Sequence, residues 1–310
     1  MEVLIVSPEY FPEETLSELM PLANIESKKM SYDELSEQIE KYDVIITRIG
    51  IKFDKHLLER AKNLKIIATA TTGTDHIDLE YAKERGIEVI SAPGANAIAT
   101  AEYTFGLMLT LMRRVPWAFD SLKRFDYERS GFLGNELKGK KLGIIGFGRI
   151  GSQIGRYARS FGLEILTYDP YINKSLAEEI GAKIVPLDEL LKESDIITLH
   201  AFASPENENM ISFGEFSKMK DTAFLINVAR GSLVDEDALL GALKNKKIQG
   251  AALDVLKEEP PSENNKLIIY AKSNDNLIIT PHLGGSTEEA VYDAARHVVR
   301  KVKEFFNSSV

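Results

Sequence analysis

Short apolar runs alternate with helical patterns along almost the whole chain. Four such runs in the first third and six after residue 140 have the length and composition of strands. Nearly all are apolar on both faces, as are the strands of a parallel sheet that helices cover on both sides. This alternation is typical of βαβ units with right-handed crossovers, so it predicts two α/β lobes. The predicted strands are Val3–Val6, Val44–Thr47, Lys65–Ala70, Glu88–Ser91, Lys141–Ile145, Glu164–Tyr168, Asp195–Leu199, Ala223–Val228, Gly250–Val255 and Leu277–Thr280.

The length of the chain also favours two domains, since 310 residues are about twice the usual domain length. The longest apolar stretch, Tyr103–Met112, has only ten residues, whereas a membrane span needs about 20. We therefore expect a buried helix over Ala97–Arg114, between the two groups of strands, and no membrane partner. The start of the sequence, Met1-Glu2-Val3, has no basic region, so no signal peptide is expected.

The composition is that of a globular protein, with 44% hydrophobic and 27% charged residues. The net charge of −9 disfavours a nucleic-acid partner, because proteins that bind through phosphate contacts are usually basic. The chain has no cysteine, which excludes disulfides, thiolate metal sites and cysteine nucleophiles. We expect a cytoplasmic protein and predict no metal site.

A glycine-rich segment fits the dinucleotide-binding fingerprint G-x-G-x-x-G. The residues Gly146-Phe147-Gly148-Arg149-Ile150-Gly151 follow a predicted strand and open a helical pattern that Gly162 ends. The next predicted strand ends just before Asp169, 18 residues beyond Gly151. This is the context that the fingerprint requires. The alternative is an ordinary glycine turn with an N-capping Asp.

Each position of this segment has a physical role in binding NAD. Gly146 permits the tight turn, Gly148 lets the backbone approach a pyrophosphate, and Gly151 lets the helix pack closely on the strand. The N-terminus of the helix offers N–H groups and a positive partial charge to the phosphates. Asp169 can accept both ribose hydroxyls and would repel a 2′-phosphate, so NAD is favoured over NADP.

Three charged residues that follow later strands are candidates for catalysis: Arg230, Glu259 and His282. In an open parallel sheet, the carboxyl ends of the strands lie on the edge where a dinucleotide binds, so these side chains should converge beside the nicotinamide. Singly, each has an ordinary alternative: a structural His at a strand end, a solvated Arg, a loop Glu. Their common placement after the dinucleotide fingerprint favours the joint functional interpretation.

This trio suits the oxidation of a 2-hydroxy acid, in which the hydroxyl proton must leave along with the hydride. His282 can act as the general base, and as the acid in reverse, because imidazole titrates near working pH. Glu259 can hold the imidazole and raise its pKa. Arg230 can pair with the substrate carboxylate and polarise the carbonyl oxygen.

Two further strand-end residues have open interpretations. Asp254 could support the site or cap a loop. His200 could touch the cofactor or fill a polar strand end. The sequence does not decide between these alternatives.

Over about Val44 to Ala295, the chain resembles the D-isomer-specific 2-hydroxyacid dehydrogenases. Within that family it looks most like the phosphoglycerate dehydrogenases. The segments that carry the resemblance are Thr72–Asp78, Ala92–Asn96, Ala101-Glu102, Gly139–Gly151, Asn227–Gly231, Glu258–Pro261 and Thr280–Thr287.

The resemblance implies site residues position by position. Arg230, Glu259 and His282 match the catalytic residues of the family, and the loop at Thr72 and Gly73 matches the one whose N–H groups meet the substrate carboxylate. The expected cofactor-binding residues are Gly146, Gly148, Arg149, Ile150, Gly151, Asp169, His200, Ala229, Arg230, Asp254, His282 and Gly284. The expected substrate-binding residues are Arg48, Thr72, Gly73, Arg230 and His282. Two positions depart from the family pattern: Phe202 replaces a usual Pro, and Gly50 replaces a common basic residue.

The resemblance also implies two Rossmann- or flavodoxin-like doubly wound parallel-sheet domains. Residues 1–96 and 285–310 would form a substrate domain, and residues 97–284 an NAD-binding domain. Family members are usually dimers built on the NAD-binding domains, so a homodimer is expected. Because the sequence ends at Val310, we expect no regulatory C-terminal extension and no serine feedback through one.

The resulting prediction is an NAD-dependent D-2-hydroxyacid dehydrogenase. Its expected small-molecule partner is a 2-hydroxy or 2-keto acid, namely 3-phospho-D-glycerate, which gives 3-phosphohydroxypyruvate in serine biosynthesis. A glyoxylate or hydroxypyruvate reductase is the alternative within the enzyme class. An NAD(H)-sensing protein similar to transcriptional corepressors is the alternative from another class, and it predicts tight NADH binding with negligible turnover.

Overall fold

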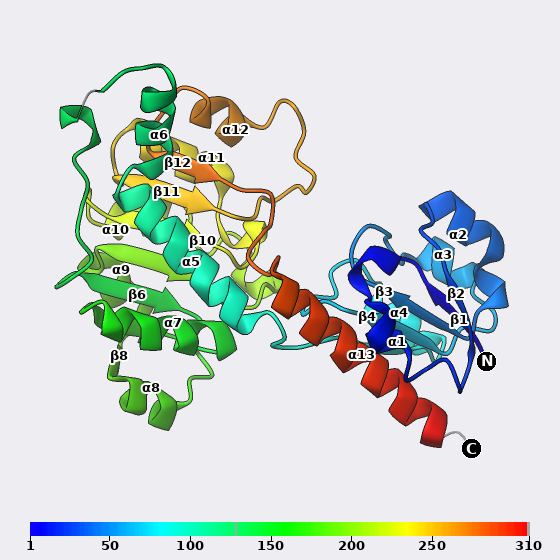
Figure 1. Ribbon diagram of the computed structural model, residues 1–310. Helices are drawn as coiled ribbons and strands as arrows, with labels where there is room; N and C mark the ends of the chain where they lie inside the picture. Colours follow the sequence, from blue (N-terminus) through cyan, green and yellow to red (C-terminus); the bar gives the residue numbers. More distant parts are fainter. Residues whose placement is uncertain (128, 309–310) are drawn as a thin grey trace. The chain divides into compact units, whose positions relative to one another are not determined.

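The computed structural model describes residues 1–127 and 129–308. The chain divides into two compact units (Figure 1): Met1–Asn96 with Ser286–Val310, and Ala97–Gly285. The chain therefore crosses between the units twice. The second crossing falls one residue later than the predicted boundary at 284/285, because Gly285 groups with the second unit. The backbone N–H of the preceding Gly284 is hydrogen-bonded to Asp254 of that unit, which holds this end of the segment there.

The first unit is built on a five-stranded parallel sheet with the order β2-β1-β3-β4-β5. This is the flavodoxin-like strand order. The central strands are almost entirely buried, which explains why their sequences are apolar on both faces. The strands are β1 (Glu2–Ile5), β2 (Asn24–Ser27), β3 (Val44–Thr47), β4 (Ile66–Thr69) and β5 (Glu88–Ile90).

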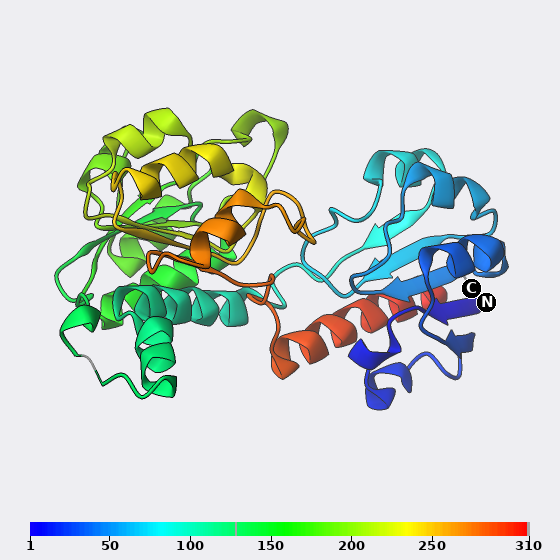
Figure 2. The same ribbon diagram turned by 90° about the horizontal axis from the view of Figure 1, so that it is seen from above.

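Helices cover both faces of this sheet. The long helix α13 (Glu288–Ser308) lies along one face (Figure 2) and, with α1 (Glu13–Leu16), completes one apolar core. The other core lies under α2 (Tyr32–Gln38), α3 (Lys55–Arg60) and α4 (Leu79–Glu84). Two 3₁₀ turns, Pro8–Tyr10 and Ile39–Lys41, complete the unit.

The second unit has a seven-stranded parallel sheet with the order β12-β11-β10-β9-β6-β7-β8. The order reverses between β6 and β9, where this class of sheet binds its ligands. The strands are β6 (Lys141–Ile145), β7 (Glu164–Tyr168), β8 (Ala182–Ile184), β9 (Ile196–Leu199), β10 (Phe224–Asn227), β11 (Gly250–Leu253) and β12 (Leu277–Ile279).

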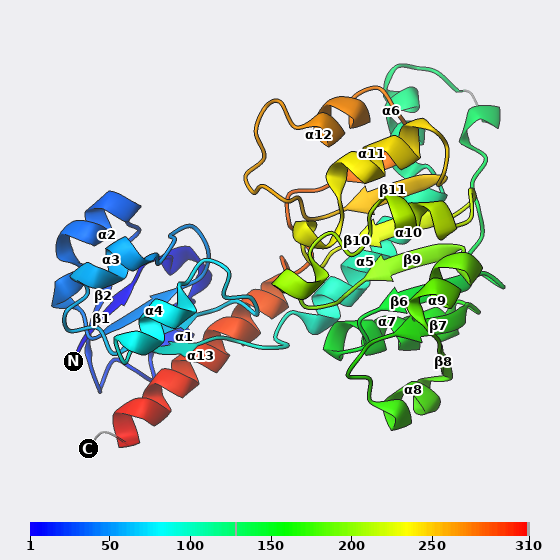
Figure 3. The same ribbon diagram turned by 180° about the vertical axis from the view of Figure 1, so that it is seen from behind.

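Two layers of helices enclose this sheet. One core lies under α5 (Ala97–Met112), α7 (Arg149–Ser160) and α8 (Lys174–Ile180), and α6 (Val115–Lys123) follows α5. The opposite core (Figure 3) lies under the four remaining helices, α9 (Leu187–Glu193), α10 (Phe213–Lys218), α11 (Glu236–Lys244) and α12 (Lys266–Ala271). Short 3₁₀ turns occupy Ser130–Phe132, Pro205–Asn207 and Gly231–Leu233.

The predicted class, two doubly wound parallel-sheet α/β domains, is confirmed. All ten predicted strands are present, and two more, β2 and β8, lie at sheet edges. The predicted long buried helix is α5, which ends at Met112. None of the helices formed by the described residues combines the length and the apolar character that crossing a bilayer requires.

Candidate active site

The glycine turn after β6 leaves little room for side chains. Gly146 has φ +91°, in the region that favours glycine, and a Cβ placed on it would lie 2.5 Å from the backbone nitrogen of Ala201. A Cβ on Gly151 would lie 2.1 Å from the carbonyl oxygen of Gly146. These contacts explain why glycine stands at both positions.

Gly148 differs from its neighbours because nothing lies within 4 Å of where its Cβ would be. It is the N-cap of α7, and Arg149, Ile150 and Gly151 form the first turn of that helix. The free space at Gly148 and the N–H groups of this turn suit a phosphate group. The turn therefore fits the pyrophosphate of a dinucleotide.

Asp169 follows β7 and lies beside the glycine turn. Its Oδ2 accepts a hydrogen bond from the N–H of Phe147 at 2.8 Å, and its Oδ1 accepts one from the N–H of Tyr171 at 2.8 Å. These bonds fix the carboxylate next to the turn while its remaining lone pairs can still accept hydroxyl protons. This placement suits the predicted contact with a ribose.

His200 follows β9, and its backbone lies against Gly146. Its Nε2 is 2.7 Å from Oγ1 of Thr198, and its buried Nδ1 has no hydrogen-bond partner among the described residues. Burial lowers the pKa of His200 to about 3, so the ring is neutral at physiological pH. The geometry favours the interpretation of His200 as a polar side chain that fills a strand end. Its predicted contact with the cofactor stays a prediction.

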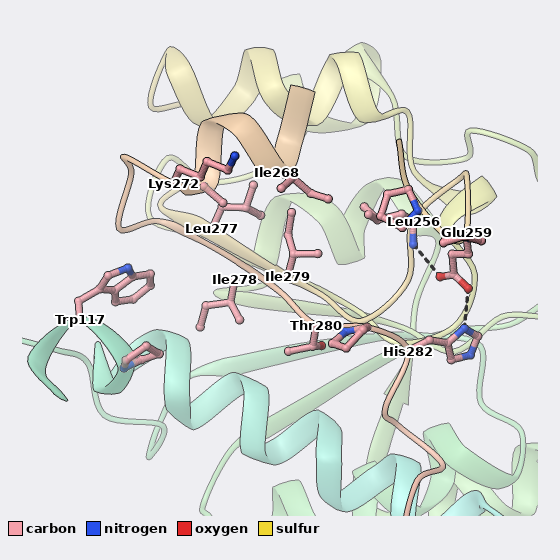
Figure 4. Close-up of a pocket in the computed structure, with 15 residues that line it drawn as sticks. Trp117, Leu256, Glu259, Ile268, Lys272, Leu277, Ile278, Ile279, Thr280 and His282 are labelled. Carbon is pink, nitrogen blue, oxygen red and sulfur yellow. Dashed lines mark hydrogen bonds and ion pairs between the residues drawn. The ribbon is translucent and has the colours of Figure 1, made fainter. Parts of the chain in front are cut away.

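His282 and Glu259 form a direct pair (Figure 4). Nδ1 of His282 lies 2.7 Å from Oε2 of Glu259, and Oε1 of Glu259 accepts the backbone N–H of Leu256 at 2.9 Å. The two side chains are 44% and 36% exposed, respectively, so both can be reached from solvent. His282 has φ +54°, a left-handed conformation that is uncommon outside glycine.

Arg230 comes from the neighbouring strand end, after β10. Its guanidinium Nη1 donates to the carbonyl of Ala229 at 2.7 Å. A Cβ on Gly231 would lie 2.0 Å from the carbonyl carbon of Leu256, so the Arg230 turn and the Glu259 loop meet backbone to backbone. The structure thus brings the three predicted catalytic residues together within one unit.

The three charges act on one another. The hydrogen bond that His282 donates to Glu259 raises the pKa of His282 above its ordinary value. The negative charges of Glu259 and Asp254 raise it further, while burial and the Arg230 charge lower it. Burial alone would raise the pKa of Glu259. Two hydrogen bonds, from His282 and from the Leu256 N–H, and the positive charges of His282 and Arg230 outweigh burial. Together they hold the pKa of Glu259 below its usual range.

An apolar groove of about 660 Å³ runs away from the His282–Glu259 pair. Figure 4 shows the pair at one end and Trp117 at the other, with β12 side chains between them. The groove residues are Pro116, Trp117, Leu256, Glu259, Pro260, Pro261, Ile268, Ala271, Lys272, Leu277, Ile278, Ile279, Thr280, Pro281 and His282.

The predicted substrate residues Arg48, Thr72 and Gly73 belong to the first unit and follow β3 and β4. The guanidinium carbon of Arg48 lies 4.4 Å from the ring centroid of Tyr10. The hydroxyl of Thr72 lies 2.7 Å from Oδ1 of Asn96, and the carbonyl of Gly73 accepts a hydrogen bond from a neighbouring threonine. All three therefore lie at the carboxyl edge of the five-stranded sheet.

Two buried polar side chains support the turns that carry Arg230 and His282. Asn227, at the end of β10, is fully buried and bonded to the backbone at Ala229 and Arg230. Asp254, 1% exposed after β11, is bonded to the turn that carries His282, including Gly284. Asn227 was not predicted as a site residue. A polar residue closing an apolar strand, three positions before Arg230, is the signal that could have identified it.

A seven-stranded sheet with this glycine turn defines a dinucleotide-binding α/β protein, and comparison with known proteins specifies the class. Residues 105–284 match the NAD-binding domain of the D-isomer specific 2-hydroxyacid dehydrogenases. The chain therefore belongs to the D-isomer specific 2-hydroxyacid dehydrogenase family, and its cofactor is NAD.

Individual relatives differ in their substrates. D-3-phosphoglycerate dehydrogenase of Methanocaldococcus jannaschii is 43% identical over 306 residues, which are 98% of this chain and 57% of that protein. Hydroxypyruvate reductase of Thermotoga maritima is 40% identical over 278 residues, covering 90% of this chain and 89% of that protein. D-lactate dehydrogenase of Aquifex aeolicus, solved with NAD and lactic acid, aligns with a TM-score of 0.87 at 33% identity over 99% and 96% of the two chains. The chain spans about half the length of the D-3-phosphoglycerate dehydrogenases that it matches.

Proposed function

We propose that the protein is an NAD-dependent dehydrogenase of D-2-hydroxy acids. The observation that carries the proposal is the His282–Glu259 pair with Arg230 at adjacent strand ends, in the same unit as the glycine turn. An acid–base pair and a cation are the groups that this reaction requires from the protein. When bound, the cofactor would supply the remaining chemistry, with NAD as the hydride acceptor for oxidation and NADH as the hydride donor for reduction.

The residues of the chain divide the work as follows. Neutral His282 accepts the hydroxyl proton of the substrate at Nε2, because Nδ1 faces Glu259. Glu259 stabilises the resulting imidazolium and holds the ring in place. Arg230 pairs with the substrate carboxylate and stabilises charge on the oxygen of the product carbonyl. In the reverse direction the imidazolium returns its proton.

For the substrate we propose 3-phospho-D-glycerate. The similarity to D-3-phosphoglycerate dehydrogenases over nearly the whole chain supports it. Arg48 also supports it, since a half-buried guanidinium at the carboxyl edge of a sheet suits an anionic group. The alternative substrate is hydroxypyruvate or glyoxylate, which the relative from Thermotoga maritima favours, because this chain covers 89% of its length.

Steady-state rates across a panel of D-2-hydroxy acids and their 2-keto products test both proposals. We expect the highest kcat/KM for 3-phospho-D-glycerate with NAD. A higher kcat/KM for hydroxypyruvate or glyoxylate would assign the alternative. Tight NADH binding in a fluorescence titration, with turnover of no acid in the panel, would support the NAD(H)-sensing protein and refute the enzyme.

We also propose that the chain forms a homodimer through its NAD-binding unit. Large apolar side chains gather on and after α6, where Phe119, Leu122, Phe125 and Leu133 are mostly exposed. Exposed apolar side chains that form a patch mark interaction surfaces, and we propose that these four side chains form one. The cytoplasmic location expected from the sequence stays a prediction.

A further inference from the structure

We propose that Asn227 and Asp254 are positioning residues, each of which holds a different catalytic group. Asn227 holds the turn of Arg230, and Asp254 holds the turn of His282. The inference rests on the proposed function, because it assigns separate tasks to Arg230 and His282. It makes a specific claim: damage to one support should impair substrate binding, and damage to the other should impair proton transfer.

Asp254 is joined to the His282 turn by three hydrogen bonds that its carboxylate accepts. Oδ1 accepts the hydroxyl of Thr280 at 2.7 Å and the N–H of Leu283 at 2.8 Å, and Oδ2 accepts the N–H of Gly284 at 2.7 Å. The backbone carbonyl of Asp254 accepts the N–H of His282 at 2.8 Å. The carboxylate is almost completely buried, so its bonds to this turn are its main interactions.

These bonds bracket the one residue of the turn that has a left-handed backbone. His282 lies between Thr280 and Leu283, both of which are tied to Oδ1 of the same carboxylate. A left-handed residue other than glycine costs free energy and persists only where its surroundings fix it. Asp254 therefore fixes the direction in which the imidazole leaves the backbone.

Asn227 supports Arg230 in a parallel way. Its Oδ1 accepts the N–H of Ala229 at 3.0 Å, and its Nδ2 donates to the carbonyl of Arg230 at 2.9 Å. The side-chain amide thus links the N–H of Ala229 to the carbonyl of Arg230, and so holds the turn in which the chain leaves β10. This turn requires one side-chain donor and one side-chain acceptor, and an asparagine amide provides both.

The two supports are neighbours, yet their side chains serve different turns. The backbone N–H of Asp254 donates to the carbonyl of Asn227 at 2.8 Å, as part of the β10–β11 pairing. Their side-chain bonds share no partner. The consequences of the two substitutions should therefore be separable.

The first test is Asp254→Asn, which keeps the size of the side chain. An amide cannot accept on both sides, so its NH₂ group would face a backbone N–H, and the turn should loosen. We expect kcat to fall on the order of 10–10²-fold, as for a small misplacement of a catalytic group. The charged groups that face His282 are Glu259, Asp254 and Arg230, of which Glu259 and Asp254 raise the imidazole pKa. Loss of the Asp254 charge should therefore lower this pKa, and the rise of kcat/KM with pH for oxidation of the hydroxy acid (its pH limb) should move to lower pH.

The second test is Asn227→Ala, which removes both bonds to the Arg230 turn. We expect KM for the acid to rise at least about tenfold, since a bidentate guanidinium contact depends on orientation. The pH limb should not move to lower pH, because His282 keeps Glu259 and Asp254. The control is Thr167→Val, which removes another buried hydrogen bond of the same sheet, from Thr167 Oγ1 to the carbonyl of Ile144 at 3.1 Å. It should lower thermal stability without changing the pH profile.

Circular dichroism and thermal unfolding show whether each variant is folded. If Asp254→Asn does not fold, Thr280→Val removes one of the three donors; it should lower kcat by loosening the turn, and the limb should not move to lower pH because the charge of Asp254 remains. Two results would overturn the inference: an unchanged limb and kcat in the Asp254 variant, or equal effects of the two substitutions on KM and on the limb.

A measurement without substrate separates this inference from the proposed function. The chain has five histidines, so the ring signals can be assigned by NMR and the pKa of His282 followed directly. We expect a lower His282 pKa in Asp254→Asn than in the wild type, whatever the protein oxidises. An unchanged His282 pKa would refute the role of Asp254 even if the enzyme is active, whereas inactivity on every acid would refute only the proposed function.

Discussion

His282, the general base of the proposed function, has a backbone conformation that few residues adopt. Its φ of +54° lies in the left-handed region, where Asn, Asp and His are more frequent than other residues. A substitution by alanine would therefore change both the imidazole and the stability of the turn. Asparagine is the better replacement, because it tolerates the backbone and lacks a group that titrates near neutral pH.

We predict that His282→Asn lowers kcat by about 10²–10⁴-fold, which is the usual contribution of general acid–base catalysis. NADH affinity should fall far less than kcat, because the glycine turn and Asp169 are untouched. Steady-state kinetics and a fluorescence titration measure the two quantities. Wild-type turnover in this variant would remove His282 from the mechanism.

A second prediction concerns the pH dependence that Glu259 sets. Its hydrogen bond is the largest cause of the raised His282 pKa. Acid oxidation requires neutral His282, so kcat/KM for oxidation should rise with pH through this raised pKa. Reduction of the keto acid requires the imidazolium, so its rate should fall through the same pKa.

In Glu259→Gln, both limbs should move to lower pH, and turnover should drop because the imidazolium loses its carboxylate. Profiles of kcat/KM against pH in both directions check this. Limbs that stay in place would mean that Glu259 does not control the protonation of His282.

At the scale of elements, every interior strand could be predicted from sequence, and so could the edge strands β5 and β12, whereas the edge strands β2 and β8 could not. The runs at β3 and β4 are buried at every position, and their sequences contain almost only apolar residues. β2, with the sequence Asn-Ile-Glu-Ser, and β8, with Ala-Lys-Ile, lie at sheet edges and are mostly exposed. An edge strand contacts one neighbour only, so its residues need not be apolar and leave little periodic signal.

In the candidate site, the charged residues could be predicted from sequence, but the hydrogen bonds that hold their turns could not. Arg230, Glu259 and His282 could be predicted because each charged residue follows an apolar strand, and parallel strand ends share one edge. The bonds of Asn227 and Asp254 could not, because they depend on how two turns fold back over their strands. Such local backbone geometry is not encoded in a hydrophobic pattern.

The contact between the Arg230 turn and the Glu259 loop leads to a third prediction. A Cβ on Gly231 would lie 2.0 Å from the carbonyl carbon of Leu256, so Gly231→Ala should push the two loops apart. We expect a loss of about 1–3 kcal/mol in the free energy of unfolding, typical of overpacking, and a lower kcat. Urea denaturation and steady-state kinetics measure these effects.

Gly214→Ala in α10 is the matched control, because nothing lies within 4 Å of the added methyl group. It should leave stability and kcat unchanged or slightly improve stability. Equal stability of both variants would show that the loops at Gly231 and Leu256 can separate freely.

At the scale of the whole molecule, the apolar surface on and after α6 predicts self-association. The double variant Phe119→Glu/Leu122→Glu places two charges on this surface and should convert a dimer into a monomer. The control, Phe213→Glu, changes an equally exposed phenylalanine on α10 and should leave the dimer intact. Sedimentation velocity distinguishes the two masses, and a wild-type chain that sediments as a monomer would contradict the prediction.

The two crossings between the units, after Asn96 and after Gly285, leave the glycine turn after β6 and the candidate residues Arg230, Glu259 and His282 on one uninterrupted stretch of polypeptide. Under the proposed function, a gene fragment coding for that stretch would carry the glycine turn together with every residue assigned to proton transfer. The flanking coding sequence, which carries Arg48 and the Thr72 loop, can diverge or be exchanged by recombination without separating the proton acceptor from its carboxylate. New acid preferences can thus arise in such a lineage while the reaction itself is inherited intact.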